Sequence, residues 1–207
     1  MNKLHQINRE YKNLLKVNKS PPIYICENFI SSKECDYMIN ENKDKMNHST
    51  VVKLVNGKEQ LVEDSHRNSE SCHLLNDNYN FLIQRISNLI RKDSKYFEGL
   101  QVGHYKKGGF YKSHNDALDI HTKLGKSFIK TRGQRIITVL IYLNNVKKGG
   151  TTYFNNLDLR IKPKKGMALI FFPAFLNREI DERTLHTAED VIDEKWVTQL
   201  WVRDVIQ

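Results

Sequence analysis

A histidine and an aspartate separated by one residue stand in the segment FYKSHNDALD, at residues 110–119. If this segment is extended, His114 and Asp116 project from the same face of a strand. An imidazole and a carboxylate side by side can bind one metal ion, and a third ligand would complete a facial triad that leaves positions open on a non-haem Fe(II). The same spacing is also found in solvated loops, so the pair alone does not establish a metal site.

The third ligand is left open by spacing alone, because the chain has eight histidines. His186 precedes the apolar segment KWVTQLWV near the C-terminus. In a jelly roll an early and a late strand come together, so a ligand from this region is topologically reasonable. The other histidines considered for this role are His66, His73, His104 and His121.

The composition is that of a globular protein with an excess of basic over acidic residues. The 207 residues suit one domain, and 39% hydrophobic content can form a core. The net charge of +9 could attract nucleic acid, but the lysines are scattered, and we do not expect such binding. The chain has no apolar run of membrane-spanning length, no signal-peptide core and only three cysteines without CxxC spacing. We therefore expect a soluble, intracellular protein without a membrane partner.

The first half of the chain, residues 1–95, is predicted to be mostly helical. Residues 7–17 favour a short polar helix. Ser31 and Glu34 stand at the spacing of a capping box, which predicts a helix that begins there. Between residues 77 and 92, apolar side chains recur at i, i+3, i+4 and i+7, a pattern typical of an amphipathic helix packed on a sheet.

The second half, over about residues 99–205, is predicted to consist of short strands separated by glycine turns. A hairpin turn is expected at residues 107–109, and the apolar run QRIITVLIYLNNV predicts a strand buried on both faces. Such a series favours a sandwich or jelly roll, and the helices before it make the fold α+β. We expect an N-terminal extension over residues 1–20 and a single domain over residues 21–207.

Four segments follow one another between residues 99 and 203: LQVGHYKKGGFYKSHND, GQRIITVLIYLNNVKKGGTTYF, IKPKKGMALIFF and LHTAEDVIDEKWVTQLWV. In this order they resemble the 2-oxoglutarate- and Fe(II)-dependent dioxygenases, and most closely the prolyl 4-hydroxylase branch. The opening IYICENFISSKECDYMI is similar to that branch's first strand and helix, so the resemblance covers about residues 20–205. It implies a double-stranded β-helix (jelly roll) core supported by N-terminal helices. It also implies that His114, Asp116 and His186 bind the iron.

The resemblance further implies a 2-oxoglutarate pocket. The distant carboxylate of this co-substrate needs a cation, and Lys195 matches the family's lysine for that role. Tyr105, Thr138 and Trp201 match other residues of the same pocket. The turn between His186 and Lys195 is one residue shorter than is usual in the branch. A slip of one residue in a strand would turn Lys195 to the opposite face.

The implied reaction is the hydroxylation of a substrate C–H bond with Fe(II), O2 and 2-oxoglutarate, release of succinate and CO2, and ascorbate as reductant. We expect a peptidyl-proline 4-hydroxylase acting on Pro-rich or collagen-like sequences, with no catalytic residue beyond the metal centre. Arg67 falls where the branch carries a motif near its substrate groove. Two polar segments, 47–73 and 117–133, are candidate loops that close over a substrate. The first of them contains a possible Asn56-Gly57 turn.

Two other functions stay open at this point. The same scaffold could hydroxylate another amino acid or a small metabolite. A different class would be a non-catalytic module that binds peptide or nucleic acid. The sequence leaves the oligomeric state open.

Overall fold

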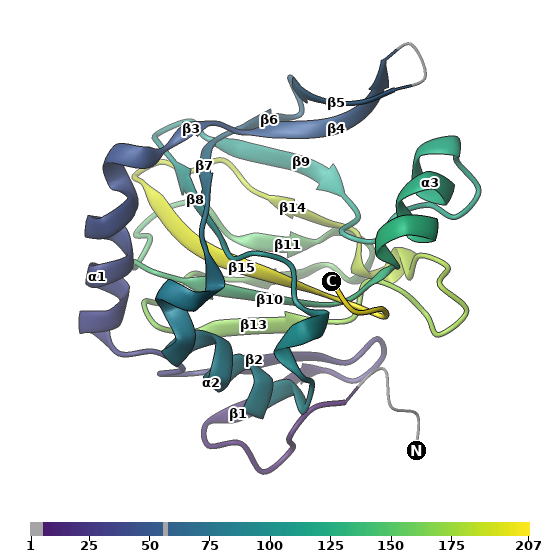
Figure 1. Ribbon diagram of the computed structural model, residues 1–207. Coiled ribbons are helices and arrows are strands. Elements are labelled where there is room, and N and C mark those ends of the chain that lie inside the picture. The colour runs from purple at the N-terminus through teal and green to yellow at the C-terminus, as the bar shows by residue number, and fades with distance from the viewer. Residues whose placement is uncertain (1–5, 56–57) are drawn as a thin grey trace.

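The computed structural model describes residues 6–55 and 58–207 (Figure 1). Within these ranges two antiparallel sheets face each other. The larger sheet consists, in spatial order, of β1 (Leu14–Asn18), β2 (Ile23–Cys26), β13 (Ala168–Phe171), β10 (Arg135–Tyr142), β15 (Lys195–Arg203), β8 (Gln101–Tyr105), β7 (Glu70–His73) and β3 (Asn47–His48). The smaller sheet consists of β12 (Leu159–Ile161), β11 (Thr152–Phe154), β14 (His186–Ala188), β9 (Phe110–His114) and β6 (Arg67–Asn68).

A separate two-stranded hairpin, β4 (Thr50–Val55) and β5 (Lys58–Glu63), extends from the top of the molecule in Figure 1. Three α-helices accompany the sheets: α1 (Ser32–Asn42), α2 (Asn80–Ile90) and α3 (Lys123–Arg132). Short 3-10 helices cover Lys43–Lys45, Asn76–Tyr79, Ser94–Tyr96, Asn155–Leu157 and Glu182–Thr184. The strand-rich core with few helices agrees with the predicted α+β jelly roll.

The two N-terminal helices support the larger sheet, as predicted. α1 begins with the expected capping box, in which Ser31 Oγ accepts the Glu34 N–H at 3.2 Å and Glu34 Oε2 accepts the Ser31 N–H at 2.7 Å. Arg85 of α2 pairs with the same Glu34 at 3.0 Å, so one carboxylate both caps α1 and joins it to α2. The apolar face of α2 is buried against the sheet.

Strand β10 separates the two cores of the molecule. Ile137, Val139 and Ile141 belong to the apolar cluster shared with α1 and α2, whereas Thr138 and Leu140 alternate with them and face the smaller sheet. Between the sheets, Phe154 of β11 meets Phe171 of β13 edge-to-face. Because both faces of β10 are covered, its sequence is apolar almost throughout, as the run predicted.

The helix predicted over residues 7–17 is wrong. Residues 14–18 form β1, which pairs with β2 at the edge of the larger sheet. Asn13 has φ 62°, a left-handed conformation that an α-helix cannot contain. The first half is also less helical than expected, because five strands lie between residues 47 and 73. The predicted Asn56-Gly57 turn lies outside the described residues.

The hairpin predicted at residues 107–109 is also wrong. The turn exists, with Gly108 at φ 77°, but β8 before it pairs with β15 and β7 in the larger sheet. β9 after it pairs with β14 and β6 in the smaller sheet. The turn therefore carries the chain from one sheet to the other. Local turn chemistry cannot show this, because the pairing partners are distant in sequence.

Segment 117–133, expected to be a polar loop, contains α3. Thr122 caps this helix by accepting the Gly125 N–H at 3.0 Å, and Gly133 with φ 71° follows the last turn. Both residues were available in the sequence as helix-boundary signals. Whether this segment and residues 47–73 close over a substrate stays a prediction.

Among the described residues no helix is long and apolar enough to cross a membrane. The three cysteines, Cys26, Cys35 and Cys72, are buried free thiols. The proposed boundary at residue 20 stays a prediction, although β1, which precedes it, is already part of the larger sheet.

Candidate active site

The two histidines and the aspartate singled out by the sequence meet at one end of the smaller sheet. β9 ends at His114 and β14 begins at His186, and the strand register pairs these two residues directly. Asp116 follows β9 by two residues. Its Oδ1 lies 3.9 Å from His114 Nε2, and its Oδ2 lies 4.0 Å from His186 Nε2. One potential ligand atom from each residue lies within 4.8 Å of the others, so a single ion can reach all three.

Hydrogen bonds fix the orientation of both imidazole rings. His114 Nδ1 lies 2.9 Å from the Lys112 carbonyl oxygen, and His186 Nδ1 lies 3.0 Å from that of Thr184. A carbonyl can only accept, so each Nδ1 carries the proton and donates. The lone pair of each Nε2 is therefore directed toward Asp116. Metal-binding histidines are usually held by such a bond from the second ring nitrogen.

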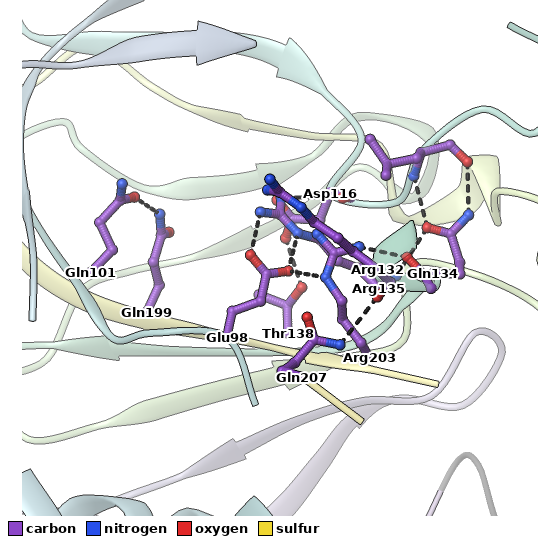
Figure 2. Close-up of polar contacts among 12 residues, drawn as sticks. Glu98, Gln101, Asp116, Arg132, Gln134, Arg135, Thr138, Gln199, Arg203 and Gln207 are labelled. Atoms are coloured by element: carbon purple, nitrogen blue, oxygen red, sulfur yellow. Dashed lines mark hydrogen bonds and ion pairs between the residues drawn. The ribbon is translucent and has the colours of Figure 1, made fainter. Parts of the chain in front are cut away.

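Asp116 is held from two directions. Thr138 Oγ1 of β10 donates a 2.7 Å hydrogen bond to Asp116 Oδ2, as Figure 2 shows. The amide of Gln134 clamps the backbone of Leu118, accepting its N–H at 2.9 Å and donating to its carbonyl at 2.7 Å. These bonds fix the turn that follows β9, and Asp116 with it.

The site favours the protonation states that bind a metal. Burial raises the pKa of Asp116, but the charges of His186, His114 and Arg135 outweigh burial and hold the pKa below its usual value. Burial, followed by the charge of His186, lowers the pKa of His114. A carboxylate and a neutral imidazole are the forms that act as ligands. The donor set thus suits Fe(II), which accepts imidazole and carboxylate ligands.

Lys195 supplies a buried positive charge to the same region. The register pairs it with Tyr105, and the side chain points between the sheets despite the short turn before it. It is only 1% exposed, and its Nζ lies 5.4 Å from the Tyr105 ring centroid and 5.7 Å from that of Tyr142. In the described part of the chain no carboxylate forms an ion pair with it. Burial lowers its pKa to about 7. A buried ammonium without a counterion is costly, so this site suits an anionic ligand.

Three other predicted pocket residues lie near Lys195 or the cluster of His114, Asp116 and His186. Tyr105 is buried, and its hydroxyl contacts Ser69 and Arg67. Thr138 is opposite Trp201 in the strand register, and its hydroxyl donates a hydrogen bond to Asp116, so it lies beside the candidate metal ligands. Trp201 forms one wall, and its Nε1 is buried without a hydrogen-bond partner among the described residues.

Arg67 lines the same cavity as the candidate metal ligands. Its Nε donates to Ser69 Oγ at 2.8 Å, and its Cζ lies 4.9 Å from the Tyr111 ring centroid. A cavity of about 880 Å³ connects these residues. Its lining includes the predicted residues Arg67, Tyr105, His114, Asp116, His186, Lys195 and Trp201.

Three further residues of this cavity were missed by the sequence reasoning. Tyr111 stacks on the His114 ring with 3.6 Å between centroids. Arg135 lies with its Cζ 3.8 Å from the Trp201 ring centroid and binds Glu98 through two nitrogens, at 2.6 and 2.8 Å (Figure 2). The position of Tyr111 on the same strand as His114 was a usable signal. The pairing of Glu98 with Arg135 was not, because 37 positions separate them.

The chain is similar to known proteins along most of its length. Residues 100–203 match the family model of the 2OG-Fe(II) oxygenase superfamily. The chain is 33% identical to a putative prolyl 4-hydroxylase of Acanthamoeba polyphaga mimivirus, covering 87% of this chain and 74% of that protein. It is 30% identical to the probable prolyl 4-hydroxylase 6 of Arabidopsis thaliana, covering 91% and 71%.

Solved structures agree with this relationship. The viral collagen prolyl hydroxylase of Paramecium Bursaria Chlorella virus-1, in its complex with 2-oxoglutarate (2OG), superposes with a TM-score of 0.66 at 28% identity. The match covers 88% of this chain and 96% of that one. A Trichoplax adhaerens prolyl hydroxylase, 19% identical with a TM-score of 0.59, shares the fold.

Fold and site together define a double-stranded β-helix oxygenase that uses Fe(II) and 2-oxoglutarate. Within this superfamily, the chain belongs to the prolyl 4-hydroxylase family. The predicted family, jelly-roll core, enzyme class, metal and co-substrate are thereby confirmed. A non-catalytic binding module is not favoured.

Proposed function

We propose that this enzyme hydroxylates proline residues in peptides, with His114, Asp116 and His186 as the Fe(II) ligands and Lys195 as the anchor of 2-oxoglutarate. One observation carries the assignment of these residues. The three ligands line a single cavity together with the buried Lys195, which forms no ion pair with any residue that the structure describes. When Fe(II), 2-oxoglutarate and O2 are bound, they supply the oxidation of a C–H bond to an alcohol, with release of succinate and CO2.

The side chains of the protein bind and orient the reactants. Lys195 neutralises the distant carboxylate of the co-substrate, and Tyr105 lies beside it as a hydroxyl donor. Thr138 keeps Asp116 ionised and in place. The buried rings of Tyr105 and Tyr142 enclose the Lys195 ammonium and exclude water from it, and Trp201 lines the same cavity.

The form of the cavity favours a peptide over a free amino acid. Beyond the metal ligands, it continues between the β4–β5 hairpin and α3, where Val51 and Leu61 line one side and Leu118 and Phe128 the other. Aromatic-lined grooves bind extended, proline-rich segments because these are already ordered as polyproline II. The names of the relatives support proline as the target residue. Arg67 is proposed to contact such a peptide, and ascorbate to serve as reductant.

The experiment is incubation of the protein with Fe(II), ascorbate, 2-oxoglutarate and peptides that contain proline in Pro-rich and collagen-like contexts. We expect a mass gain of one oxygen atom on proline, located by tandem mass spectrometry and accompanied by an equal amount of succinate. Collagen-like sequences are tested separately from other Pro-rich sequences, because hydroxylation of proline does not by itself identify the preferred peptide sequence. Succinate formation stimulated by a free amino acid or metabolite, with no peptide modified, would instead establish the alternative hydroxylase.

A further inference from the structure

At the end of the cavity beside α3, arginine side chains outnumber the carboxylates that pair with them. Arg135 binds both oxygens of Glu98, and Arg203 Nε lies 2.9 Å from the same carboxylate (Figure 2). Arg132, at the end of α3, lines this part of the cavity as well. Among the residues that the structure describes, no carboxylate lies within ion-pair distance of Arg132. Glu98 therefore pairs with two guanidinium groups, whereas the guanidinium of Arg132 lines the same end of the cavity without a carboxylate partner in the described part of the chain.

The neighbouring acidic groups have other partners. Asp116 accepts the Thr138 hydroxyl and faces the two histidines, as described above. Asp204, which follows β15, pairs with Arg178 at 2.6 Å. α3 itself adds Lys123, Lys126, Lys130 and Arg132, and no acidic residue. Burial lowers the pKa of Arg203, and the charges of Arg135 and Arg132 lower it further against the opposing effect of Glu98. The charge of Arg132 is therefore felt within this cluster.

The arginines are also held in a form suited to carboxylate binding. The Arg132 Cζ lies 4.9 Å from the Phe128 ring centroid, and the Arg135 Cζ lies 3.8 Å from that of Trp201. Stacking on an aromatic ring orients the planar guanidinium and leaves its N–H edge free to donate. Glu98 already occupies two nitrogens of Arg135, whereas the Arg132 side chain is exposed at the cavity wall.

We propose that this cationic end of the cavity is a subsite for an acidic side chain, Asp or Glu, located a few residues from the hydroxylated position of the peptide. The inference rests on the proposed peptide substrate and adds a sequence preference to it. Arg132 is the residue that binds the acidic side chain, because Arg135 and Arg203 are already paired with Glu98.

The test uses sets of three fluorescein-labelled proline peptides. The peptides of a set differ only in Glu, Gln or Lys at one flanking position, and each set tests a different position on either side of the proline. Binding to the Fe(II)-loaded protein is followed by fluorescence anisotropy without O2 and without 2-oxoglutarate, so that it does not depend on turnover. At one position on one side, we expect the Glu peptide to bind roughly three- to tenfold more tightly than the Lys peptide. Raising NaCl to about 0.5 M should reduce this ratio.

Two variants of equal charge change identify the residue. Arg132→Glu should abolish or invert the Glu-over-Lys preference. Lys126→Glu, an exposed residue of α3 that does not line the cavity, should preserve it. Equal loss of preference in both variants would show a general effect of net charge and would overturn the proposal.

Failure of this inference can be distinguished from failure of the proposed function. Equal affinity for the three peptides at every position, with proline still hydroxylated, overturns the acidic subsite alone. A clear Glu preference without hydroxylation supports the subsite and refutes proline hydroxylation. Absence of binding by all the peptides overturns the subsite, because it removes the peptide site itself.

Discussion

Replacement of Lys195 by methionine distinguishes a ligand-binding lysine from a structural one. The Lys195 side chain is enclosed by Tyr105 and Tyr142 and has no carboxylate partner in the described part of the chain. A buried ammonium without a counterion opposes folding. Methionine is of similar length and carries no charge. We therefore expect Lys195→Met to leave the ligand-free protein at least as stable as the wild type, while 2-oxoglutarate binding is lost or weakened.

The size of the stability effect follows from the pKa of Lys195, which falls from 10.5 to about 7 on burial. Between these values the unfolded chain binds more protons than the folded one, so the destabilising effect of the lysine is largest below pH 7 and vanishes as the pH approaches 10.5. At about 1.4 kcal/mol per pKa unit, the effect at pH 7 is on the order of 4 kcal/mol as an upper bound. The stability difference between variant and wild type should shrink as the pH rises.

Lys195→Met should weaken the binding of 2-oxoglutarate, although the same substitution should not destabilise the fold. A hydrogen bond to a charged group contributes about 1.5–3 kcal/mol, so the Kd for 2-oxoglutarate should rise roughly 10- to 150-fold in Lys195→Met. In the wild type, binding above pH 7 requires uptake of a proton by Lys195. The Kd should therefore increase by up to about tenfold per pH unit there, and the variant should lack this slope.

The assay combines isothermal titration of 2-oxoglutarate into the Fe(II)-loaded protein without O2 with urea unfolding of the ligand-free protein. Lys162→Met is the matched control, because Lys162 is exposed and lies outside this cavity. A destabilised Lys195→Met protein with unchanged 2-oxoglutarate affinity would refute the reasoning, since Lys195 would then be a structural residue.

Three other predictions concern the metal ligands and their supports. His114→Ala and Asp116→Ala should each lower Fe(II) binding at least tenfold, measured by metal content after dialysis; unchanged content in both would remove the assigned site. Thr138→Val keeps the side-chain shape but removes the 2.7 Å bond to Asp116, so Fe(II) affinity should fall about tenfold; equal affinity in calorimetry would show that this bond does not position the ligand. Glu98→Gln leaves Arg135 without its carboxylate partner and should destabilise the fold by about 3–5 kcal/mol in urea unfolding; a loss below about 1 kcal/mol would contradict the importance of this ion pair.

The features that the sequence predicted well are those set by local pattern. The apolar run of β10 required burial on both faces, and the Ser31–Glu34 spacing required a helix start. The spacing of His114 and Asp116 was a local signal of the same kind. The choice of His186 needed the resemblance to a family, because eight histidines were available and none of the spacings selected it.

Apart from α3 and Tyr111, for which local signals existed, the features that were missed depend on partners distant in the chain. β1 is a strand because β2 offers an unpaired edge, although its own sequence favoured a polar helix. The turn at Gly108 looks like a hairpin but joins two sheets, because β8 and β9 each find other neighbours. The cationic cluster of Arg132, Arg135 and Arg203 is assembled from three elements, so no sequence window contains it.

Electron density with an anomalous signal for bound iron tests the central claim most directly. The protein crystallised with Fe(II) and 2-oxoglutarate without O2 is predicted to show one strong anomalous peak bonded to Nε2 of His114, Nε2 of His186 and the carboxylate of Asp116. The distant carboxylate of 2-oxoglutarate should lie within hydrogen-bond distance of Lys195 Nζ. No peak among these three side chains, or a peak bound by other residues, would contradict the account.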